Sequence, residues 1–452
     1  MTSLRPYQQD TIDLLLSSQH KRSLVVMATG LGKTLIGLTL IKHYQSNILY
    51  LAHTEELLLQ PSRRLTLPHG ILKASYPTTS HTIQFASIQT LARRTLHYTP
   101  SLIIVDEAHR VLSSQYQEVL SRYPHARLVG LTATPYRLSG EALPFDEIIE
   151  TCTPTLAFAQ NYLHEPTIYA PHLPDLTKAR IEAGDYVGTA GLVGDIGSSY
   201  KKHALNLPTI VFASSVAHSK ALQATFASQG HLAYHLDGSL DSYARAKARD
   251  VLAQGGIVTN CDLLTEGFDY APLQCVILAR PTLSMGLHFQ QIGRVMRTAP
   301  GKTSALILDH AGNTLRHGFP HDHHTFSLTG LAHTASSPTP RGIAISRCEA
   351  CAFVYRPAPA CPSCGYTPAP PTTTLSSQVE SILLTRSTDK RLASPGEKAK
   401  EYERLLIMAR FHGYKDGWAD FRFKSKYGHF PAPVSKSKVR KQLAKSLVMW
   451  EK

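Results

Sequence analysis

Ser23-Leu24-Val25-Val26-Met27-Ala28-Thr29-Gly30-Leu31-Gly32-Lys33-Thr34 is the stretch that decides the fold. A short apolar strand, a turn with two glycines and the start of a helix follow one another in it. Backbone N–H groups of such a turn converge on an anion, and the helix N-terminus adds a partial positive charge. Gly30 and Gly32 let the backbone approach a phosphate closely. The stretch therefore predicts a phosphate-binding turn in an α/β sheet.

The turn also offers side chains for a nucleotide and its metal ion. Lys33 supplies a cation for the β- and γ-phosphates, and the hydroxyl of Thr34 can bind Mg²⁺. The full pattern has glycine where Met27 lies, so the match is partial, and an ordinary strand–turn–helix is the alternative. We expect the nucleotide to contact the whole turn: Ala28, Thr29, Gly30, Leu31, Gly32, Lys33 and Thr34.

A second apolar run, residues 102–105, ends in two carboxylates and supports this interpretation. Asp106, Glu107, Ala108 and His109 follow it directly. In an α/β sheet, the C-terminal end of a strand faces the ligand crevice. Asp106 is therefore predicted to hold Mg²⁺ and Glu107 to polarise the attacking water. The alternative is a solvated helix start.

With these motifs the chain resembles the superfamily 2 helicases, and Asp106 to His109 is the DEAH box. Four further segments resemble family motifs in the family's order. They are the adenine-reading Q motif (residues 5–8), the motif that couples hydrolysis to movement (131–135), the fifth motif (265–269) and the sixth (290–297). The resemblance covers about residues 1–320. It is greatest to RadD-type bacterial repair helicases and their phage relatives, which carry a zinc-binding segment after the second lobe.

The resemblance implies a role for each motif residue. Arg5 and Gln8 would read adenine, and Gly267 and Asp269 would contact the ribose or the water, although Asp269 is almost as readily a turn aspartate. Coupling of hydrolysis to movement would involve His109, Thr132, Thr134 and Gln290. The predicted catalytic set is Lys33, Asp106, Glu107, Arg294 and Arg297.

The two arginines of the sixth motif are expected to stabilise charge on the transferred phosphoryl group. An arginine finger contributes on the order of 10³–10⁵ in rate. Arg294 and Arg297 are spaced i and i+3, so on a helix they would share a face. They could reach the γ-phosphate only if the second lobe closes on the first. The alternative is a pair of solvated arginines.

Two places are candidates for contact with a nucleic-acid backbone. His53 and Thr54 follow a strand at residues 47–52, at a junction that touches nucleic acid in similar helicases. A plain strand–helix turn, with Thr54 as the cap, has equal weight. Arg93 and Arg94 follow a segment that resembles the next strand-contacting motif, and the alternative for them is a solvated helix face.

Four of the seven cysteines form two Cys-x-x-Cys pairs: Cys348 with Cys351, and Cys361 with Cys364. This spacing brings four thiolates within tetrahedral reach of a structural zinc ion. The other three cysteines are scattered, which is not a disulfide framework. The histidine-rich segment 313–328 is interpreted as a connector and not as a metal site, because Gly318 and Pro320 interrupt it.

We therefore expect an α/β protein with two RecA-like parallel-sheet lobes of the P-loop NTPase class, a zinc knuckle and a small helical basic module. The expected boundaries are 1–140 for the first, ATP-binding lobe, 141–205 for an inter-lobe connection, 206–325 for the second lobe, 345–367 for the knuckle and 386–452 for the basic module. The expected cofactors are ATP, Mg²⁺ and Zn²⁺.

The charge distribution predicts a polyanionic partner. The net charge is +14, and residues 386–452 contain 17 basic and 7 acidic residues, so this tail carries most of the excess. Its segment 421–430 alternates aromatic and basic residues, which can stack on bases and bind phosphates, or can form a packed module with a basic surface.

The expected partner is DNA, single-stranded or branched, with RNA not excluded and the motor monomeric. No apolar run approaches the ~18 residues of a membrane span. No signal peptide is evident, so a reducing cytoplasm is the expected location.

Overall fold

The computed structural model describes most of the chain. The described residues are 3–368, except 78, 136–142, 178, 183–184, 190, 192–193, 237–241, 266–267, 323–327 and 329–343, and then 402, 405–406 and 417–427. The chain divides into two compact units, residues 1–368 and 369–452.

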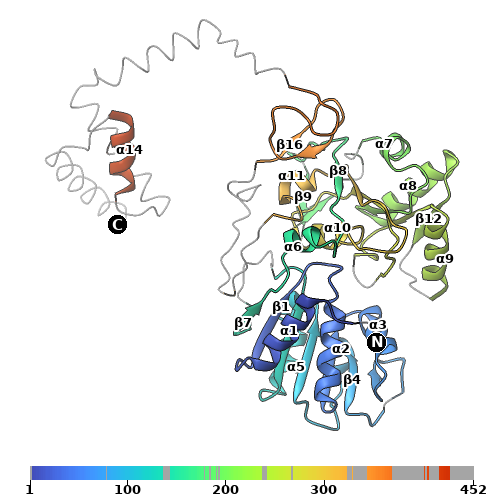
Figure 1. The fold of residues 1–452 in the computed structure, drawn as a ribbon, viewed down its shortest axis with the longest axis vertical. Coiled ribbons are helices and arrows are strands. Elements are labelled where there is room, and N and C mark those ends of the chain that lie inside the picture. Colours follow the sequence, from blue (N-terminus) through green and yellow to red (C-terminus); the bar gives the residue numbers. More distant parts are fainter. Residues whose placement is uncertain are drawn as a thin grey trace, which may run out of the picture. The chain divides into compact units, whose positions relative to one another are not determined.

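A seven-stranded parallel sheet forms the core of lobe 1, the N-terminal half of the first unit (Figure 1). Its strand order is β3-β4-β2-β5-β6-β1-β7. The strands are β1 (Arg22–Val26), β2 (Ile48–Ala52), β3 (Gly70–Leu72), β4 (Ile83–Ser87), β5 (Leu102–Asp106), β6 (Arg127–Thr132) and β7 (Glu147–Ile149). Strands β2, β4 and β5 are buried at every position, as expected of a parallel sheet covered on both faces.

Helices cover both faces of this sheet. The apolar residues of α1 (Pro6–Ser17), α2 (Lys33–Tyr44) and α3 (Glu55–Arg64) pack on one face. Those of α4 (Ile88–Leu91) and α5 (Ser114–Ser121) pack on the other. A 3-10 turn, η1 (Ala108–Arg110), follows β5. The expected α/β lobe is therefore present.

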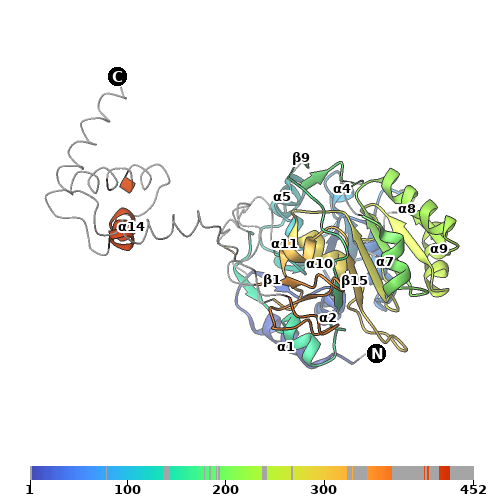
Figure 2. The same cartoon turned by 90° about the horizontal axis from the view of Figure 1, so that it is seen from above.

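Lobe 2 contains a six-stranded parallel sheet in the order β12-β13-β11-β14-β15-β8. Its strands are β8 (Thr167–Tyr169), β11 (Thr209–Ala213), β12 (Ala233–Leu236), β13 (Ile257–Asn260), β14 (Cys275–Ala279) and β15 (Leu306–Asp309). Helices α7 (Ile196–His203) and α8 (Val216–Ser228) cover one face, and α9 (Ser242–Ala253) and α10 (Met285–Ile292) cover the other. Figure 2 shows these four helices from above. The helices α6 (Pro154–Ala159) and α11 (Asn313–His317) and the hairpin β9 (Arg180–Glu182) with β10 (Asp185–Val187) complete the lobe.

The segment 141–205, expected to connect the two lobes, contributes to both sheets. Strand β7 pairs with β1 at the edge of the first sheet, and β8 pairs with β15 at the edge of the second. Both strands have three residues, which is too short for a recognisable alternation of apolar and polar side chains. Lobe 1 therefore extends beyond residue 140, and lobe 2 begins before residue 206.

A small cysteine-containing module packs against the edge of the second sheet. Its hairpin joins β16 (Ser346–Arg347) to β17 (Val354–Tyr355). The amide of Ala170, just after β8, donates to the carbonyl of Ala352 at 2.8 Å, and Tyr169 forms an isolated bridge with Phe353. This contact protects a sheet edge that would otherwise expose unpaired backbone groups.

In the second unit the structure describes one helix, α14 (Trp418–Tyr427), and a few residues before it. Ala419 and Phe423 pack against the ring of Tyr402, and the guanidinium of Arg422 lies 5.6 Å from the ring centre of Trp418. Most of the predicted basic module lies outside the described residues, including the segment 428–430 of its aromatic and basic run.

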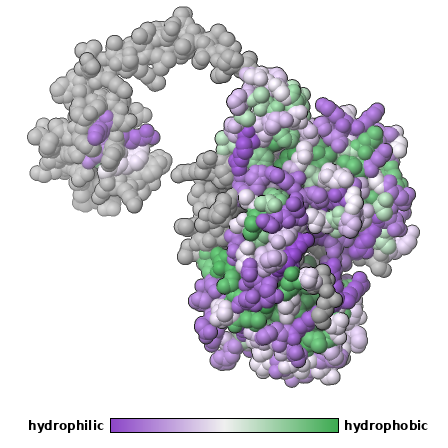
Figure 3. Space-filling model, viewed as in Figure 1, coloured by the Kyte–Doolittle hydropathy of each residue, from purple (hydrophilic) through white to green (hydrophobic). Residues whose placement is uncertain are grey.

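Hydrophilic and hydrophobic residues are interspersed over the face of the first unit drawn in Figure 3. Among the described residues, no helix has the length and apolar character that crossing a membrane requires.

Candidate active site

The turn between β1 and α2 has the backbone conformation that the glycines predict. Gly30 and Gly32 have φ angles of 96° and 90°, in the left-handed region that other residues rarely adopt. Gly32 is the N-cap of α2, so the first amides of this helix point toward the turn. Met27, which replaces the glycine of the full pattern, has its side chain buried in the core. Methionine in place of this glycine therefore leaves the anion-binding part of the turn, at Gly30 and Gly32, with its left-handed backbone.

Lys33 and two carboxylates meet beside this turn. The ammonium of Lys33 donates to the carbonyl of Met27 at 3.1 Å. Burial lowers the pKa of Lys33, while the negative charges of Glu107 and Asp106 raise it. The cation thus lies where the β- and γ-phosphates of a nucleotide on the turn would bind.

Asp106 is the last residue of β5 and is held in place by two donors. The hydroxyl of Tyr50 donates to its Oδ2 at 2.8 Å, and the amide of Glu107 donates to its Oδ1 at 3.0 Å. Burial, together with the charge of Glu107, raises the pKa of Asp106 to about 6. A divalent cation would offset the desolvation of this carboxylate, so Asp106 fits the predicted Mg²⁺. Thr34, the other predicted ligand, is the second residue of α2.

Glu107 lies at the centre of the predicted coupling residues. Its backbone is left-handed (φ 52°, ψ 54°), a strained conformation that is common at active sites. One carboxylate oxygen, Oε2, is 3.4 Å from His109 Nδ1 and also accepts from Gln290 Nε2 at 3.4 Å. His109 is in turn 3.5 Å from the hydroxyl of Thr132. Because Gln290 belongs to α10, this network joins lobe 2 to the predicted catalytic carboxylate of lobe 1.

The motifs of the two lobes also contact one another around this network. A methyl group added at Gly286 would lie 3.1 Å from the hydroxyl oxygen of Thr134, and one added at Gly293 would lie 2.5 Å from the Cβ of Thr29. The phosphate turn and the coupling motif of lobe 1 therefore face α10 and the residue that follows it.

The arginines of the sixth motif have different partners. Helix α10 ends at Ile292, so Arg294 and Arg297 follow the helix and do not share one of its faces as expected. The guanidinium of Arg294 is buried and donates to the carbonyls of Phe268, at 2.7 Å, and Thr265. These two carbonyls orient the side chain of Arg294, so that its direction does not follow the helical spacing that the sequence suggested.

Arg297 lies over the phosphate turn. A methyl group added at Gly30 would lie 3.0 Å from Cγ of Arg297. The guanidinium of Arg297 forms an ion pair with Asp269, whose other carboxylate oxygen is 3.2 Å from Arg64 of lobe 1. Of the two arginines, Arg297 therefore has the better position for a γ-phosphate. Gly267, the other predicted contact from the fifth motif, lies outside the described residues.

The predicted adenine-reading residues brace the phosphate turn. Gln8 Nε2 and the hydroxyl of Tyr7 both donate to the carbonyl of Leu31, at 2.9 Å and 2.8 Å. Gln8 Oε1 accepts from the amide of Arg5 at 2.9 Å. The guanidinium of Arg5 lies 4.9 Å from the ring centre of Tyr162, and that ring is 5.0 Å from the ring of Tyr7.

Sequence reasoning missed Tyr162, which lies in the segment that showed no motif. An aromatic ring beside the predicted adenine site can stack on a base, so Tyr162 is a candidate site residue. Its only sequence signal is a lone tyrosine between a short helix and a short strand, which many unrelated positions share.

The predicted nucleic-acid residues lie at exposed or half-buried positions of lobe 1. The hydroxyl of Thr54 caps α3 by accepting from the amide of Leu57 at 3.4 Å, and the carbonyl of His53 accepts from Gln89 at 3.0 Å. This geometry is that of an ordinary strand–helix turn, and it remains compatible with contact to a phosphate.

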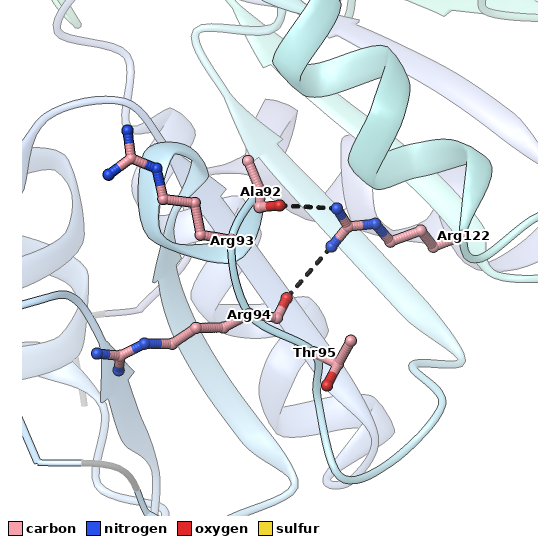
Figure 4. Close-up of a pocket in the computed structure, with 5 residues that line it drawn as sticks. All are labelled: Ala92, Arg93, Arg94, Thr95 and Arg122. Atoms are coloured by element: carbon pink, nitrogen blue, oxygen red, sulfur yellow. Dashed lines mark hydrogen bonds between the residues drawn. The ribbon is translucent and has the colours of Figure 1, made fainter.

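Arg93 and Arg94 are exposed and line a hollow of about 460 Å³ with Ala92, Thr95 and Arg122 (Figure 4). The guanidinium of Arg122 donates to the carbonyls of Ala92, at 2.8 Å, and Arg94, at 3.2 Å. Figure 4 shows that the side chains of Arg93 and Arg94 point away from Arg122. Arg122 therefore fixes the turn, and the two exposed arginines remain accessible to an anionic ligand.

The four cysteines of the two Cys-x-x-Cys pairs form one cluster. The sulfur atoms of Cys348 and Cys364 are 3.6 Å apart, and those of Cys351 and Cys361 are 3.7 Å apart. All four sulfurs lie within 4.8 Å of one another. A zinc ion with Zn–S distances of about 2.3 Å separates its tetrahedral ligands by about 3.8 Å, so the cluster fits Zn²⁺.

Among the described residues, this is the one cluster with metal-ligand geometry. In the histidine-rich segment, a ring nitrogen of the buried His317 lies 2.9 Å from the carbonyl of Thr282. This contact agrees with the interpretation of the segment as a connector. His323 and His324 lie outside the described residues.

Comparison with known proteins identifies similar sequences. A family model described as "Type III restriction enzyme, res subunit" matches residues 1–137. A 51.5 kDa protein of a Lactococcus phage (isolate 7-9) is 31% identical over 289 residues, which cover 61% of this chain and 62% of the relative. IRC3 of Saccharomyces cerevisiae, named as an ATP-dependent helicase, is 28% identical over 354 residues, covering 68% of this chain and 51% of the relative. The chain therefore matches between half and two thirds of each relative's length.

A solved structure shares the fold. The Type ISP restriction-modification enzyme LlaBIII bound to DNA superposes with a TM-score of 0.53 and 19% identity, over 68% of this chain and 28% of that one. At this identity the likeness shows the fold alone. The sequence matches therefore show similarity to a restriction-enzyme subunit family, to a phage protein and to a protein named as an ATP-dependent helicase.

Proposed function

We propose that this chain, with its two lobes of the superfamily 2 type, is an ATP-dependent DNA helicase or translocase of the DEAH class. The observation that carries the proposal is the contact of Gln290 from lobe 2 with Glu107 of lobe 1, with Arg297 lying over the phosphate turn. A hydrolysis site built from two lobes can drive their relative movement, because ATP binding and hydrolysis change what holds the lobes together. That coupling is what a nucleic-acid motor requires.

In this proposal each lobe supplies part of the hydrolysis machinery. The turn amides and Lys33 bind the phosphates, and Thr34 and Asp106 hold Mg²⁺, which neutralises charge on the β- and γ-phosphates. Glu107 orients and polarises the attacking water, while Arg297 balances the charge that develops on the transferred group. Arg294 keeps the fifth-motif segment in place beside Asp269.

DNA is the nucleic-acid substrate that we favour. The chain carries a net charge of +14, which favours a polyanionic partner, and LlaBIII, which shares the two-lobe fold, was solved bound to DNA.

We also propose the RadD-type subfamily, a role in repair, recombination or replication, a monomeric motor and a structural Zn²⁺ at the four cysteines. One alternative is a translocase that remodels duplex or branched DNA without separating strands. The other is an RNA helicase, because none of the motor motifs reads the sugar of the nucleic-acid strand.

The test is ATPase activity measured without nucleic acid and with single-stranded, duplex and forked DNA and RNA, together with unwinding of the forked substrates. We expect DNA to stimulate hydrolysis. Stimulation by RNA alone would transfer the proposal to RNA, and stimulation without unwinding would favour the remodelling translocase.

Two variants assign the chemistry. Lys33→Ala should weaken nucleotide binding, whereas Glu107→Gln should keep binding and lose turnover. Glu182→Gln, which removes a carboxylate from an exposed strand, is the matched control and should behave as wild type. Wild-type turnover by Glu107→Gln would refute the assignment of the water-polarising residue. No hydrolysis by wild type on any substrate would indicate a DNA-binding protein with an inert nucleotide site.

A further inference from the structure

Helix α3 of lobe 1 forms ion pairs with lobe 2 from both of its ends. In its first turn, the carboxylate of Glu56 forms an ion pair with the guanidinium of Arg245 of α9 at 2.7 Å, and each side chain is only 13% exposed. At its last residue, the guanidinium of Arg64 lies 3.2 Å from the carboxylate of Asp269. This helix is therefore attached to two separate parts of lobe 2.

The same helix begins at the predicted nucleic-acid contacts. His53 and Thr54 immediately precede its first residue, and Thr54 caps it. A helix of ten residues is about 15 Å long at 1.5 Å per residue, so α3 joins that junction directly to Asp269. A displacement at its N-terminus would be transmitted to Arg64, because a packed helix moves as a rigid body.

Asp269 is shared between two arginines that have different tasks. Its Oδ1 pairs with Arg297, which lies over the phosphate turn, and its Oδ2 pairs with Arg64. If Arg297 leaves Asp269 for a phosphate, the carboxylate still retains one cation. Without Arg64, the departure of Arg297 would leave the half-buried carboxylate with no cationic partner among its described contacts, which is less favourable.

We propose that Arg64 is a positioning residue for Arg297: by holding Asp269, it lets Arg297 exchange between that carboxylate and the γ-phosphate, and it makes the exchange depend on where α3 lies. The inference rests on the proposed function, since it takes Arg297 as the residue that meets the phosphate. It adds a residue outside the helicase motifs, and it connects the nucleic-acid side of lobe 1 to the chemistry.

The test is a double-mutant cycle in the full-length protein, with kcat and KM for ATP measured with and without single-stranded DNA. Arg64→Ala should lower the DNA-stimulated kcat by about three- to tenfold and leave the KM for ATP nearly unchanged. The same substitution should have no further effect in an Asp269→Asn background, because no carboxylate then competes for Arg297. Arg64→Lys should restore part of the loss.

Arg63→Ala is the matched control. It removes the same charge from the neighbouring position of α3, its side chain is exposed, and the described contacts give it no partner in lobe 2. We expect its kcat to equal that of wild type. Because Arg64 is itself 60% exposed, its removal should leave folding intact, which the unfolding temperature would verify.

Two outcomes would overturn the inference while leaving the proposed function intact. One is that Arg64→Ala and Arg63→Ala have equal kcat values, while the separate Arg297→Ala variant is inactive. The other is a loss from Arg64→Ala that persists in the Asp269→Asn background, as expected if Arg64 only contacts DNA. Wild-type protein that hydrolyses no ATP, or full activity in Arg297→Ala, would instead defeat the proposed chemistry, and the inference with it.

Discussion

Arg294 and Arg297 are three residues apart, yet their surroundings differ. Arg294 is buried, and its guanidinium donates to two backbone carbonyls of the fifth motif. Arg297 is more exposed and pairs with a carboxylate that a phosphate could replace. A buried guanidinium that donates to backbone carbonyls favours a structural role, whereas a charge in an exchangeable ion pair can serve the reaction.

Substitution of each arginine by alanine should separate these tasks. Arg297→Ala should keep the unfolding temperature and ATP affinity and reduce kcat by a factor on the order of 10³ or more. Arg294→Ala should destabilise the protein by about 3 kcal/mol, because two charge-assisted hydrogen bonds disappear in a buried place. Urea unfolding and steady-state ATPase measure the two effects. A stable Arg294→Ala variant with low kcat, beside a fully active Arg297→Ala, would reverse the assignment.

Burial disfavours the ionised form of the Asp106 carboxyl group. Its pKa is raised from 3.8 to about 6, so the folded state without a cation disfavours the ionised form. A group whose pKa is raised on folding stabilises the fold below its ordinary pKa, and this contribution is lost as pH rises through the folded value. Ionised Asp106 therefore costs stability above about pH 6, and the cost vanishes below about pH 4.

We expect Asp106→Asn to be more stable than wild type at pH 8, by an amount on the order of 2 kcal/mol, in buffer without Mg²⁺ or nucleotide. The difference should shrink as pH falls through 6 and disappear near 4. Urea unfolding of both proteins across this range checks it. A difference that grows on acidification would show that burial is not the dominant influence on Asp106.

Among the elements, the cysteine knuckle is the one that we expect to depend most on a bound ion. Its two strands have two residues each, and its core consists of three of the cysteines and three aromatic rings. So small an element cannot bury enough apolar surface to fold alone, and structural zinc sites usually supply that free energy. The knuckle covers the edge of β8, so its loss would expose an unpaired strand of lobe 2.

The purified protein should contain one Zn²⁺ per chain, and Cys361→Ser should lose it. Limited proteolysis should then cut within residues 345–367, while the two lobes remain resistant. Cys261→Ser, a cysteine outside the cluster, should retain the metal and serve as the control. Elemental analysis that finds no zinc in the wild-type protein would reject the site.

At the scale of the whole molecule, most of the excess positive charge and the proposed nucleotide site lie in different units. Every described residue of the nucleotide site belongs to the first unit, which ends at Pro368. Residues 386–452 belong to the second unit and hold 17 basic and 7 acidic residues. Non-specific attraction to DNA and hydrolysis of ATP should therefore be separable by truncation.

Removal of residues 386–452 should weaken DNA binding and flatten its salt dependence by several units. Each neutralised phosphate contributes about −0.9 to the slope of log K against log salt on duplex DNA and about −0.7 on single strands. ATPase activity without DNA should persist, and stimulation should require more DNA yet reach a similar plateau.

Arg93→Ala with Arg94→Ala in the full-length chain is the comparison for this truncation, because it removes cations from lobe 1 and keeps the tail. Unchanged affinity and slope after truncation would mean that the tail serves solubility or a protein partner. The DNA contacts would then lie on the lobes, at residues such as Arg93 and Arg94.

The sequence by itself determined the features whose residues are neighbours along the chain. The glycine turn, the carboxylates after β5 and the two Cys-x-x-Cys pairs each occupy a few consecutive residues. Their chemistry needs a fixed local spacing, which the sequence shows directly. The alternation of apolar runs and helices likewise predicted two parallel sheets, because strands buried on both faces are continuously apolar.

Only the tertiary structure decided which distant residues meet. Arg5 and Tyr162 are 157 positions apart, and Arg64 and Asp269 are 205 apart, so no local pattern relates them. Strands β7 and β8 are too short to show a period, and only their pairing with β1 and β15 assigns them to a sheet. The different partners of Arg294 and Arg297 likewise depend on the fold, which brings two carbonyls to the first and a carboxylate to the second.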